Sequence, residues 1–469
     1  MYQIDFNNPV HIHFIGIGGI SMSGLAELLH TKGFTVSGSD AKDSKIIKHL
    51  MNQGIKITIG QSASNITSDI DVCVYTAAVK ENNEEFIAAK EAGIPLLDRA
   101  YLVGEVMGHY KNAISVAGTH GKTTTTSMVA MIMLEGNFDP TVSVGGILDN
   151  MGGNMRIGQS ENFIVESCEY TNSFLKFKPT NEIILNIEAE HLDFFKDLAD
   201  VRHSFRLFAE KLPKDGNLVI NGQIANYEEI TKNLPCNIFT YGVYTTPVDL
   251  NHISSDYDYA AANLSFNEFG CGSYDLIKNN TFVDRIELGV IGIHNISNSV
   301  GAIALADQLG VSIDACKKAL LKFKGTERRF QHKGVVGGVT IVDDYAHHPT
   351  EIEATLTAAL KYPHKTTWCV FQPHTYTRTK SLLKDFAKAL SHADKIVLAD
   401  IYAAREENPG DISSKDLQME LQKLGKDAYY FPSFGEIEDF LLENCTNGDL
   451  LITMGAGDVV SIGEALLGE

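Results

Sequence analysis

Residues 114–130 constrain the fold more than any other segment, because they have the pattern of a strand, a glycine loop and a helix in succession. An apolar run leads into the sequence GTHGKT at 118–123, and a helix-like stretch follows. The N–H groups of such a helix N-terminus favour an anion, a lysine adds positive charge, and a threonine hydroxyl can bind Mg²⁺. Val116 stands where the general phosphate-loop pattern has its first glycine. We nevertheless predict a nucleotide phosphate site here rather than a tight strand–helix turn without a ligand.

Composition excludes several classes of protein. A chain of 469 residues has room for about three domains, and 44% hydrophobic with 21% charged residues is ordinary for a globular protein. The net charge of −20 argues against a nucleic-acid partner and against an anionic membrane surface. The seven cysteines are dispersed without CxxC spacing, which is typical of reduced thiols. No signal peptide or membrane-spanning run is recognisable, so we expect a cytoplasmic protein without membrane insertion.

The first segment, residues 1–108, opens with a strand, a glycine-rich turn, a helix and a second strand. The turn resembles the dinucleotide fingerprint, but Ser21 stands where the third glycine is expected, so the pattern predicts a diphosphate at a helix N-terminus rather than NAD itself. Asp40 follows the second strand, where it can bind a ribose hydroxyl or serve as a helix cap or solvated loop acid. The candidate ligand-binding residues of this segment are Gly16, Gly18, Gly19, Ser21, Asp40 and Thr76.

The second segment, residues 109–322, has polar clusters after two apolar strands that follow the phosphate loop. Glu166 comes after the strand at 162–165, and His191 comes shortly after the strand at 182–186. Because carboxyl ends of parallel strands meet at one edge of a sheet, both are candidate Mg²⁺ ligands or water-holding groups beside a triphosphate. A loop acid and a capping or packed histidine are the alternative interpretations. Asn295 and Asn298 lie one turn apart at a helix start, where they can contact one ligand or cap the helix.

The third segment, residues 323–469, repeats the same design. Apolar strands at 339–342, 367–371, 395–399 and 449–454 each end in a polar or glycine cluster, which predicts another doubly wound α/β domain. Consecutive α/β units with polar residues at their carboxyl edges favour a site assembled between domains.

Nine motifs along the chain are specific when taken together. They read HFIGIGGISMSGLA, SGSD, AGTHGKTTTT, NIEAEHLD, HNISN, GTERRF, VDDYAHHPTE, FQPHTYTR and MGAGD. In this order they resemble the Mur ligase family over essentially the whole chain. The resemblance implies an α/β protein of three domains: a Rossmann-like UDP-sugar domain at 1–108, a P-loop-type ATPase domain at 109–322 and a Rossmann-like amino-acid domain at 323–469. The motif order is closest to the branch that joins L-alanine to UDP-N-acetylmuramate with ATP.

The resemblance also implies roles for individual residues. Lys122 would hold the β- and γ-phosphates, Thr123 and Glu166 would bind one Mg²⁺, and His191 a second. His347 and Arg378 would lie near the incoming alanine. The implied ATP-binding residues are Gly118, Thr119, His120, Gly121, Lys122, Thr123, Thr124, Asn295, Asn298, Arg329 and Asp344. The implied catalytic residues are Lys122, Glu166, His191, Arg329, His347 and Arg378.

Three positions depart from the family pattern. Cys168 replaces an aspartate in the cluster ESCE, Glu190 replaces the aspartate before His191, and Thr375 stands where some relatives carry an arginine. No carbamylated lysine is assigned. Alternatives remain a ligase for another amino acid or for a whole peptide, an NAD-dependent oxidoreductase, and a P-loop regulatory protein without ligase activity. Oligomeric state is left open.

Overall fold

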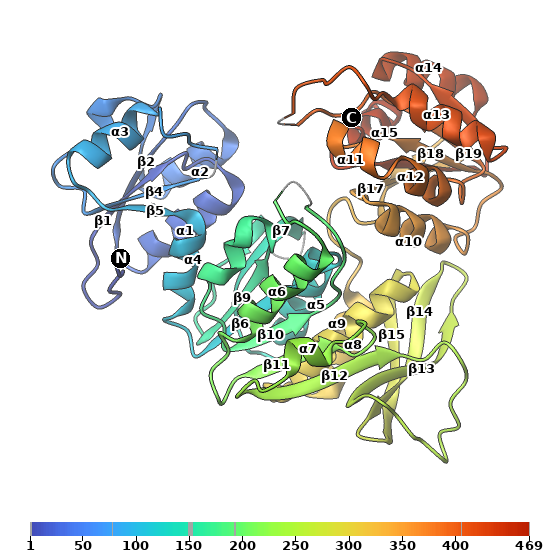
Figure 1. The fold of residues 1–469 in the computed structure, drawn as a ribbon, viewed down its shortest axis with the longest axis horizontal. Helices are drawn as coiled ribbons and strands as arrows, with labels where there is room; N and C mark the ends of the chain where they lie inside the picture. Colours follow the sequence, from blue (N-terminus) through green and yellow to red (C-terminus); the bar gives the residue numbers. More distant parts are fainter. Residues whose placement is uncertain (1, 77, 149–152, 192–193, 405, 469) are drawn as a thin grey trace.

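The computed structural model describes residues 2–468 except for 77, 149–152, 192–193 and 405, and its side chains are described outside 146–154. In this described part the chain forms three β-sheets, each covered by helices, which are distinct bodies in Figure 1. The predicted α/β class with three consecutive units is confirmed.

The N-terminal sheet pairs its strands in parallel in the order β3-β2-β1-β4-β5. The strand order reverses at β1, so the turn from β1 to α1 opens where open α/β sheets bind their ligands. Its elements are β1 (His11–Ile15), α1 (Ile20–Thr31), β2 (Thr35–Asp40), α2 (Lys45–Asn52), β3 (Lys56–Ile59), the 3₁₀ helix η1 (Ala63–Asn65), β4 (Val72–Tyr75), α3 (Glu84–Glu91), β5 (Leu96–Asp98) and α4 (Arg99–Met107).

The central sheet has the order β15-β14-β13-β12-β11-β10-β6-β9-β7-β8. Strand β6 pairs in parallel with β9 on one side and with β10 on the other, so the loop after β6 lies between the ends of both. Antiparallel strands β13 to β15 extend the sheet. The elements are β6 (Asn112–Ala117), α5 (Lys122–Glu135), β7 (Thr141–Leu148), β8 (Gly153–Arg156), β9 (Asn162–Ser167), η3 (Tyr170–Lys176), β10 (Asn181–Ile184), α6 (Leu198–Ala209), β11 (Asn217–Asn221), α7 (Glu228–Thr231), β12 (Asn237–Val243), β13 (Tyr259–Phe266), β14 (Cys271–Lys278), β15 (Thr281–Ile291), α8 (Ile293–Gln308) and α9 (Ile313–Lys322).

The C-terminal sheet has the order β16-β17-β21-β18-β19-β20, in which β16 is antiparallel to β17 and the other pairs are parallel. Strand β17 includes Asp343 and Asp344, which the sequence placed just after the strand. The elements are β16 (Gln331–Val336), β17 (Val339–Asp344), α10 (Pro349–Ala359), β18 (Thr367–Phe371), α11 (Tyr376–Ser381), α12 (Leu383–Leu390), β19 (Lys395–Leu398), α13 (Ser414–Lys423), β20 (Asp427–Tyr430), α14 (Phe434–Asn444), β21 (Leu450–Met454) and α15 (Val460–Leu467).

Helix N-termini differ in how they are capped. Helices α2, α3 and α4 begin after Ser44, Asn83 and Asp98, whose side chains accept hydrogen bonds from the first turn. By contrast, α1, α5 and α8 begin after glycines and have no side-chain cap. Their first N–H groups are therefore directed to whatever lies in front of the helix, and an anion is the favoured partner.

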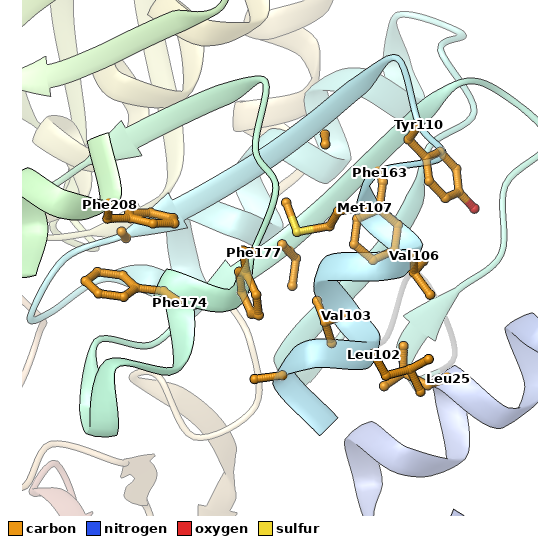
Figure 2. Close-up of a cluster of buried hydrophobic side chains, with 14 of the residues drawn as sticks. Leu25, Leu102, Val103, Val106, Met107, Tyr110, Phe163, Phe174, Phe177 and Phe208 are labelled. Carbon is orange, nitrogen blue, oxygen red and sulfur yellow. The ribbon is translucent and has the colours of Figure 1, made fainter. Parts of the chain in front are cut away.

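The hydrophobic core joins the first two domains. One buried cluster contains Leu25 of α1, Leu102 of α4, Phe163 of β9 and Phe177 after η3 (Figure 2). Helix α4 of the N-terminal domain therefore packs against side chains of the central domain. The C-terminal domain instead has separate buried clusters drawn from its own strands and helices. The N-terminal and central domains are thus held by a continuous apolar core, and the C-terminal domain is not part of it.

No described helix combines the length and the apolar character needed to cross a lipid bilayer. The sheets occupy residues 11–98, 112–291 and 331–454. The exact boundaries at 108/109 and 322/323 stay a prediction.

Candidate active site

The loop after β6 is a phosphate cradle built on two glycines with unusual backbone geometry. Gly118 has φ 150° and Gly121 has φ 82°, a region that residues with a side chain rarely adopt. A Cβ at Gly121 would lie 2.9 Å from Asn298 Oδ1, and one at Gly118 would lie 2.9 Å from the Cβ of Leu185. The loop therefore depends on glycine both for its turn and for its close approach to β10 and α8.

Lys122 lies across this loop. Its Nζ donates to the carbonyl oxygens of Gly118 and Thr119 at 2.6 and 3.0 Å, and to Glu169 Oε2 at 3.1 Å. Burial lowers the pKa of Lys122, but the charges of Glu169 and its acidic neighbours outweigh burial and raise it above its ordinary value. The ammonium is therefore charged and directed at the space in front of α5.

Oxygen donors gather next to the lysine. The Thr123 hydroxyl donates to Glu166 Oε2 at 2.9 Å, and the amide of Gly145 donates to the same oxygen at 2.8 Å. Hydroxyl and carboxylate oxygens are the donors that Mg²⁺ prefers, so Thr123 and Glu166 fit such an ion. His191 Nε2 lies 3.8 Å from Glu169 Oε1, with its backbone at φ 56°. Glu169 therefore fits a second ion at least as well as the softer imidazole does.

A cavity of about 170 Å³ lies between the phosphate loop, α8 and α10; we call it the nucleotide cavity. Aliphatic walls from Val290, Ile291 and Ala358 alternate with amide and charged groups, which suits a flat heterocycle. Asn295 Nδ2 donates to the carbonyl of Ile291 at 2.8 Å and Asn298 Nδ2 to Asn295 Oδ1 at 3.2 Å. The predicted residues on its wall are His120, Gly121, Thr124, Asn295, Asn298, Arg329 and Asp344.

A second cavity of about 590 Å³ adjoins the first; we call it the reaction cavity. All three domains line it, because Ile20 at the start of α1 faces residues of the phosphate loop and of the C-terminal domain. The predicted residues on its wall are Thr119, His120, Gly121, Lys122, Thr123, Glu166, His191, Arg329 and His347. Arg329 borders both cavities, so one guanidinium can face a nucleotide and a transferring phosphoryl group.

Asp344 is less available to a ligand than the sequence suggested. Its oxygens accept from the amides of Ala346 and Phe330 at 2.7 and 2.9 Å and from the Thr355 hydroxyl at 3.2 Å. Burial, only partly offset by the positive charge of Arg329, raises the pKa of Asp344 to about 6. The side chain borders the nucleotide cavity, but its hydrogen bonds organise the loop that carries Arg329.

Polar pairs join the central and C-terminal domains beside these cavities. His120 Nδ1 lies 3.2 Å from Glu351 Oε1, and Arg378 Nη2 donates to Glu190 Oε1 at 2.8 Å. Burial lowers the pKa of His120, but the neighbouring carboxylates of Glu188 and Glu351 outweigh burial and raise the pKa to about 9. Arg378 lies on the wall of neither cavity, whereas its partner Glu190 lines the reaction cavity.

Four residues of these contacts were not assigned a role from sequence, although Glu190 was noted as a departure from the family pattern. Glu188, Glu190, His348 and Glu351 all lie in the motifs NIEAEHLD and VDDYAHHPTE, at strand ends or at the start of α10. Position after a strand was the available signal. It could not show which of several neighbouring polar side chains turn towards another domain.

The amides of the glycine turn in the N-terminal domain already have hydrogen-bond partners within the protein. The amides of Gly16 and Gly19 donate to backbone carbonyls, and the amide of Gly18 donates to Asp40 Oδ2 at 2.9 Å. The turn itself therefore uses the amides of these glycines, and the binding of a diphosphate at the N-terminus of α1 stays a prediction. Ser21 accepts from Arg99 Nη1 at 3.0 Å, and Thr76 lies beside Gly16. The six residues cluster at one turn but line neither of the two cavities described above.

Comparison with known families agrees with this arrangement. Residues 11–111 match the Mur ligase family, catalytic domain; residues 116–306 match the Mur ligase middle domain; and residues 328–457 match the Mur ligase, glutamate ligase domain.

Individual relatives match over the full length. The UDP-N-acetylmuramate–L-alanine ligase of Lachnoclostridium phytofermentans is 69% identical and that of Agathobacter rectalis 58%, each over 100% of both chains. The crystal structure of UDP-N-acetylmuramate-alanine ligase MurC from Thermotoga maritima has a TM-score of 0.79 at 28% identity over 98% of both chains. A murein peptide ligase from Psychrobacter arcticus shares the fold, with a TM-score of 0.68 at 23% identity over 98% of both chains. With this sequence identity and this architecture, the chain belongs to the Mur ligase family.

Proposed function

We propose that the protein is an ATP-dependent ligase that joins L-alanine to the carboxylate of UDP-N-acetylmuramate, a step of peptidoglycan precursor synthesis. The observation that carries the proposal is the reaction cavity, in which the phosphate loop and acidic strand ends face Arg328, Arg329 and His347 of the C-terminal domain. Full-length relatives that carry this activity in their names support the choice of substrates.

ATP is assigned to the nucleotide cavity, with its phosphates extending over the phosphate loop into the reaction cavity. Lys122 then exchanges its bonds to the loop carbonyls for phosphate oxygens while it keeps Glu169 as a neighbour. We assign one Mg²⁺ to Thr123 and Glu166 and a second to the space between Glu169 and His191. The ions neutralise phosphate charge when bound.

The UDP-sugar is assigned to the N-terminal domain, with its diphosphate in front of α1. Because the glycine amides are engaged, we propose that N–H groups of the first turn of α1, at Ser21 and Met22, contact the diphosphate. The muramyl carboxylate then reaches the reaction cavity past Ile20.

Charge neutralisation and positioning dominate the chemistry that follows. The carboxylate attacks the γ-phosphate, ADP leaves, and an acyl phosphate remains. Lys122 and Arg329 stabilise the charge that spreads over the phosphoryl oxygens. The amine of alanine then attacks the acyl carbon, and phosphate leaves. Closure of the domains excludes the water that would hydrolyse the acyl phosphate.

His347 and Arg378 are assigned to alanine. The ring Nδ1 of His347 lies 3.0 Å from the carbonyl oxygen of Tyr345, to which it donates, so Nε2 is left to accept a proton. Burial lowers the pKa of His347, which keeps the ring neutral at physiological pH and able to take the proton that the ammonium must lose. Arg378 is assigned to the alanine carboxylate.

We place the reaction in the cytoplasm, where ATP and nucleotide-activated sugars are available, and we retain the domain limits 1–108, 109–322 and 323–469 as part of this proposal.

The decisive experiment measures ATP-dependent phosphate release with UDP-N-acetylmuramate and each amino acid in turn. We expect L-alanine to be preferred, with glycine and L-serine slower, because one methyl group in an apolar pocket is worth only about 1–3 kcal/mol. Lys122→Ala serves as the inactive control, since it removes the charge on the phosphate loop. A preference for a diacid, a diamine or a whole peptide would assign the chain to another branch of the family.

A further inference from the structure

Three side chains with metal-binding donors converge beside the nucleotide cavity, from both sides of the boundary between the central and C-terminal domains. His120 lies in the phosphate loop, Glu188 follows β10, and His348 precedes α10. One donor atom of each lies within 4.8 Å of the other two, and His120 Nε2 is 3.5 Å from Glu188 Oε2. The two imidazole rings face each other with centroids 5.0 Å apart. Such separations match donors that share one small cation.

Neighbouring residues hold these three side chains in place, and Glu188 Oε2 both faces His120 and accepts from one of these neighbours. His120 Nδ1 lies 3.2 Å from Glu351 Oε1, the Thr350 hydroxyl donates to Glu188 Oε2 at 2.9 Å, and His348 Nδ1 accepts from the amide of Thr350 at 3.4 Å. The contact of His120 with Glu351 is the arrangement typical of a metal-binding histidine, whose second ring nitrogen donates its N–H to a carboxylate. His120 Nε2 is thereby left for the shared space, while His348 Nε2 lies 3.6 Å from Glu190 Oε2, a further carboxylate beside the three side chains.

An orphaned donor atom points to the same place. Within the described chain, His120 Nε2 is buried and makes no hydrogen bond, although it lies at ion-pair distance from Glu188. A buried polar atom without a hydrogen bond is costly, and a bound ion is one of the few partners that satisfies it.

We propose that His120, Glu188 and His348 form a binding site for a divalent transition-metal ion of the Zn²⁺ class. Two imidazoles and one carboxylate are the donors of known three-ligand zinc sites, whereas Mg²⁺ prefers oxygen donors throughout. The site is thus separate from the oxygen-rich group at Thr123 and Glu166. Its ligands come from two domains, so a bound ion ties the phosphate loop to the start of α10.

The ion has a consequence for turnover that rests on the proposed function. Substrate entry and product release in a ligase of this architecture require the C-terminal domain to move against the phosphate loop. Zn²⁺ at this site holds the two together and therefore slows the reaction.

Binding is tested first, without reference to catalysis. The purified full-length protein, in millimolar Mg²⁺, competes with a chromophoric chelator for Zn²⁺. The variant His348→Asn removes the imidazole but keeps a side chain that can cap α10, and His392→Asn is the matched control on a surface histidine of the same domain. We expect the wild type and His392→Asn each to bind one Zn²⁺ ion tightly. The affinity of His348→Asn for Zn²⁺ should be lower by a factor of about ten or more. Equal affinity in all three proteins would overturn the proposal.

A spectrum identifies the donors independently of any variant at the site. Co²⁺ in place of Zn²⁺ should show the visible bands of nitrogen and oxygen ligation without a sulfur charge-transfer band. A sulfur band that disappears in Cys168→Ser would assign the metal to that exposed thiol and overturn the proposal. Thermal unfolding of metal-free His348→Asn should coincide with the wild type, which excludes misfolding as the cause of lost binding.

The link to turnover is tested separately. Zn²⁺ should inhibit alanine ligation by the wild type and by His392→Asn at lower concentration than it inhibits His348→Asn. Equal inhibition of all three would overturn the link. If the protein ligates no amino acid at all, the proposed function fails, while the chelator competition still reports on the metal site.

Discussion

At the scale of single residues, the contact between Arg378 and Glu190 shows how the group that we assign to alanine is kept in place. Arg378 Nη2 donates to Glu190 Oε1, and Nη1 lies 3.2 Å from His374 Nδ1. Burial raises the pKa of Glu190, but the charges of Arg378 and His348 outweigh it and lower the pKa to about 2. The guanidinium is therefore oriented by a carboxylate of the central domain, with its remaining donors available to a second anion.

Replacing Arg378 tests its assignment to alanine. We expect Arg378→Ala to raise the KM for L-alanine roughly 10- to 100-fold, because a hydrogen bond to a charged group is worth about 1.5–3 kcal/mol. The KM for ATP should change far less. Lys380→Ala is the matched control, since it removes a positive charge from the same helix α11 at an exposed ion pair with Asp411. Steady-state kinetics with each substrate varied provide the measurement, and an alanine KM indifferent to Arg378 would contradict the assignment.

At the scale of elements, the uncapped glycine starts of α1, α5 and α8 distinguish the ligand-facing helices from peripheral ones. The cost of leaving a helix end without a cap is about 1 kcal/mol, which an anionic ligand can recover. Gly121 before α5 is the most constrained of the three, because its left-handed backbone and its contact with Asn298 both exclude a side chain.

Two alanine substitutions separate these effects. Gly121→Ala should abolish ATP binding, since the new Cβ displaces Asn298 and the loop must change conformation. Gly310→Ala introduces the same left-handed strain, at φ 86°, but its Cβ meets nothing within 4 Å. It should cost about 1–2 kcal/mol of stability without weakening ATP binding. Calorimetric titration with ATP and chemical unfolding give the two quantities, and equal ATP affinity in both variants would refute the role of Gly121.

Strand β10 contains a buried acid, Glu182, that we expect to affect the stability of the fold. Glu182 is fully buried, and among the described residues neither carboxylate oxygen has a hydrogen-bond partner. Burial raises the pKa of Glu182 well above its ordinary value, against a weaker opposing effect of Lys211. Because the folded-state pKa is raised, the contribution to stability is fully present below the unfolded-state pKa and is lost as pH rises through the folded-state pKa.

Glu182→Gln should therefore flatten the pH dependence of unfolding. The variant cannot ionise, so at pH 8 we expect its Tm to exceed that of the wild type by a few degrees, and the difference should shrink towards pH 4. Glu161→Gln, an exposed acid one residue before β9, is the control and should leave the profile unchanged. Parallel Tm profiles for Glu182→Gln and the wild type would contradict this account.

At the scale of the whole molecule, the two domain junctions differ in kind. The N-terminal and central domains share one apolar core around α4, where Leu25, Leu102 and Phe177 are buried together (Figure 2). The C-terminal domain meets the central domain through polar pairs such as His120 with Glu351 and Arg378 with Glu190. Polar junctions permit relative motion, whereas a large apolar junction does not. We therefore expect the C-terminal domain to be the part that moves during turnover.

We expect this asymmetry to appear as two unfolding units. Leu102→Ala should destabilise the N-terminal and central domains together by about 2–5 kcal/mol, because it opens a cavity in their shared core. Phe386→Ala, in the core of the C-terminal domain, should lower the stability of that domain alone. Hydrogen-exchange mass spectrometry resolves the three domains, and faster exchange confined to the N-terminal domain in Leu102→Ala would refute the shared unit.

The sequence by itself determined the features that depend on a few neighbouring residues. The glycine loop before α5, the strand around Glu166, the strand that precedes His191 and the α/β class follow from local patterns of glycine, apolar runs and polar ends. These patterns were reliable because backbone geometry and strand pairing place such residues at one edge of a sheet. Some predicted strand boundaries were also correct, since the strand predicted at 367–371 is β18 (Thr367–Phe371).

Only the tertiary structure decided which polar groups meet. Glu188, Glu190, His348 and Glu351 are ordinary polar residues after a strand or at a helix start in sequence. Their partners lie more than 150 residues away in contacts such as Arg378 with Glu190 and Thr350 with Glu188. The sequence likewise could not predict that the amides of Gly18 and Gly19 are hydrogen-bonded within the turn, or that Asp344 accepts hydrogen bonds from its own domain. A short motif specifies the local backbone, but the direction in which a side chain finds its partner depends on how distant elements pack, and that packing is determined by the shared apolar core and the polar domain junction together.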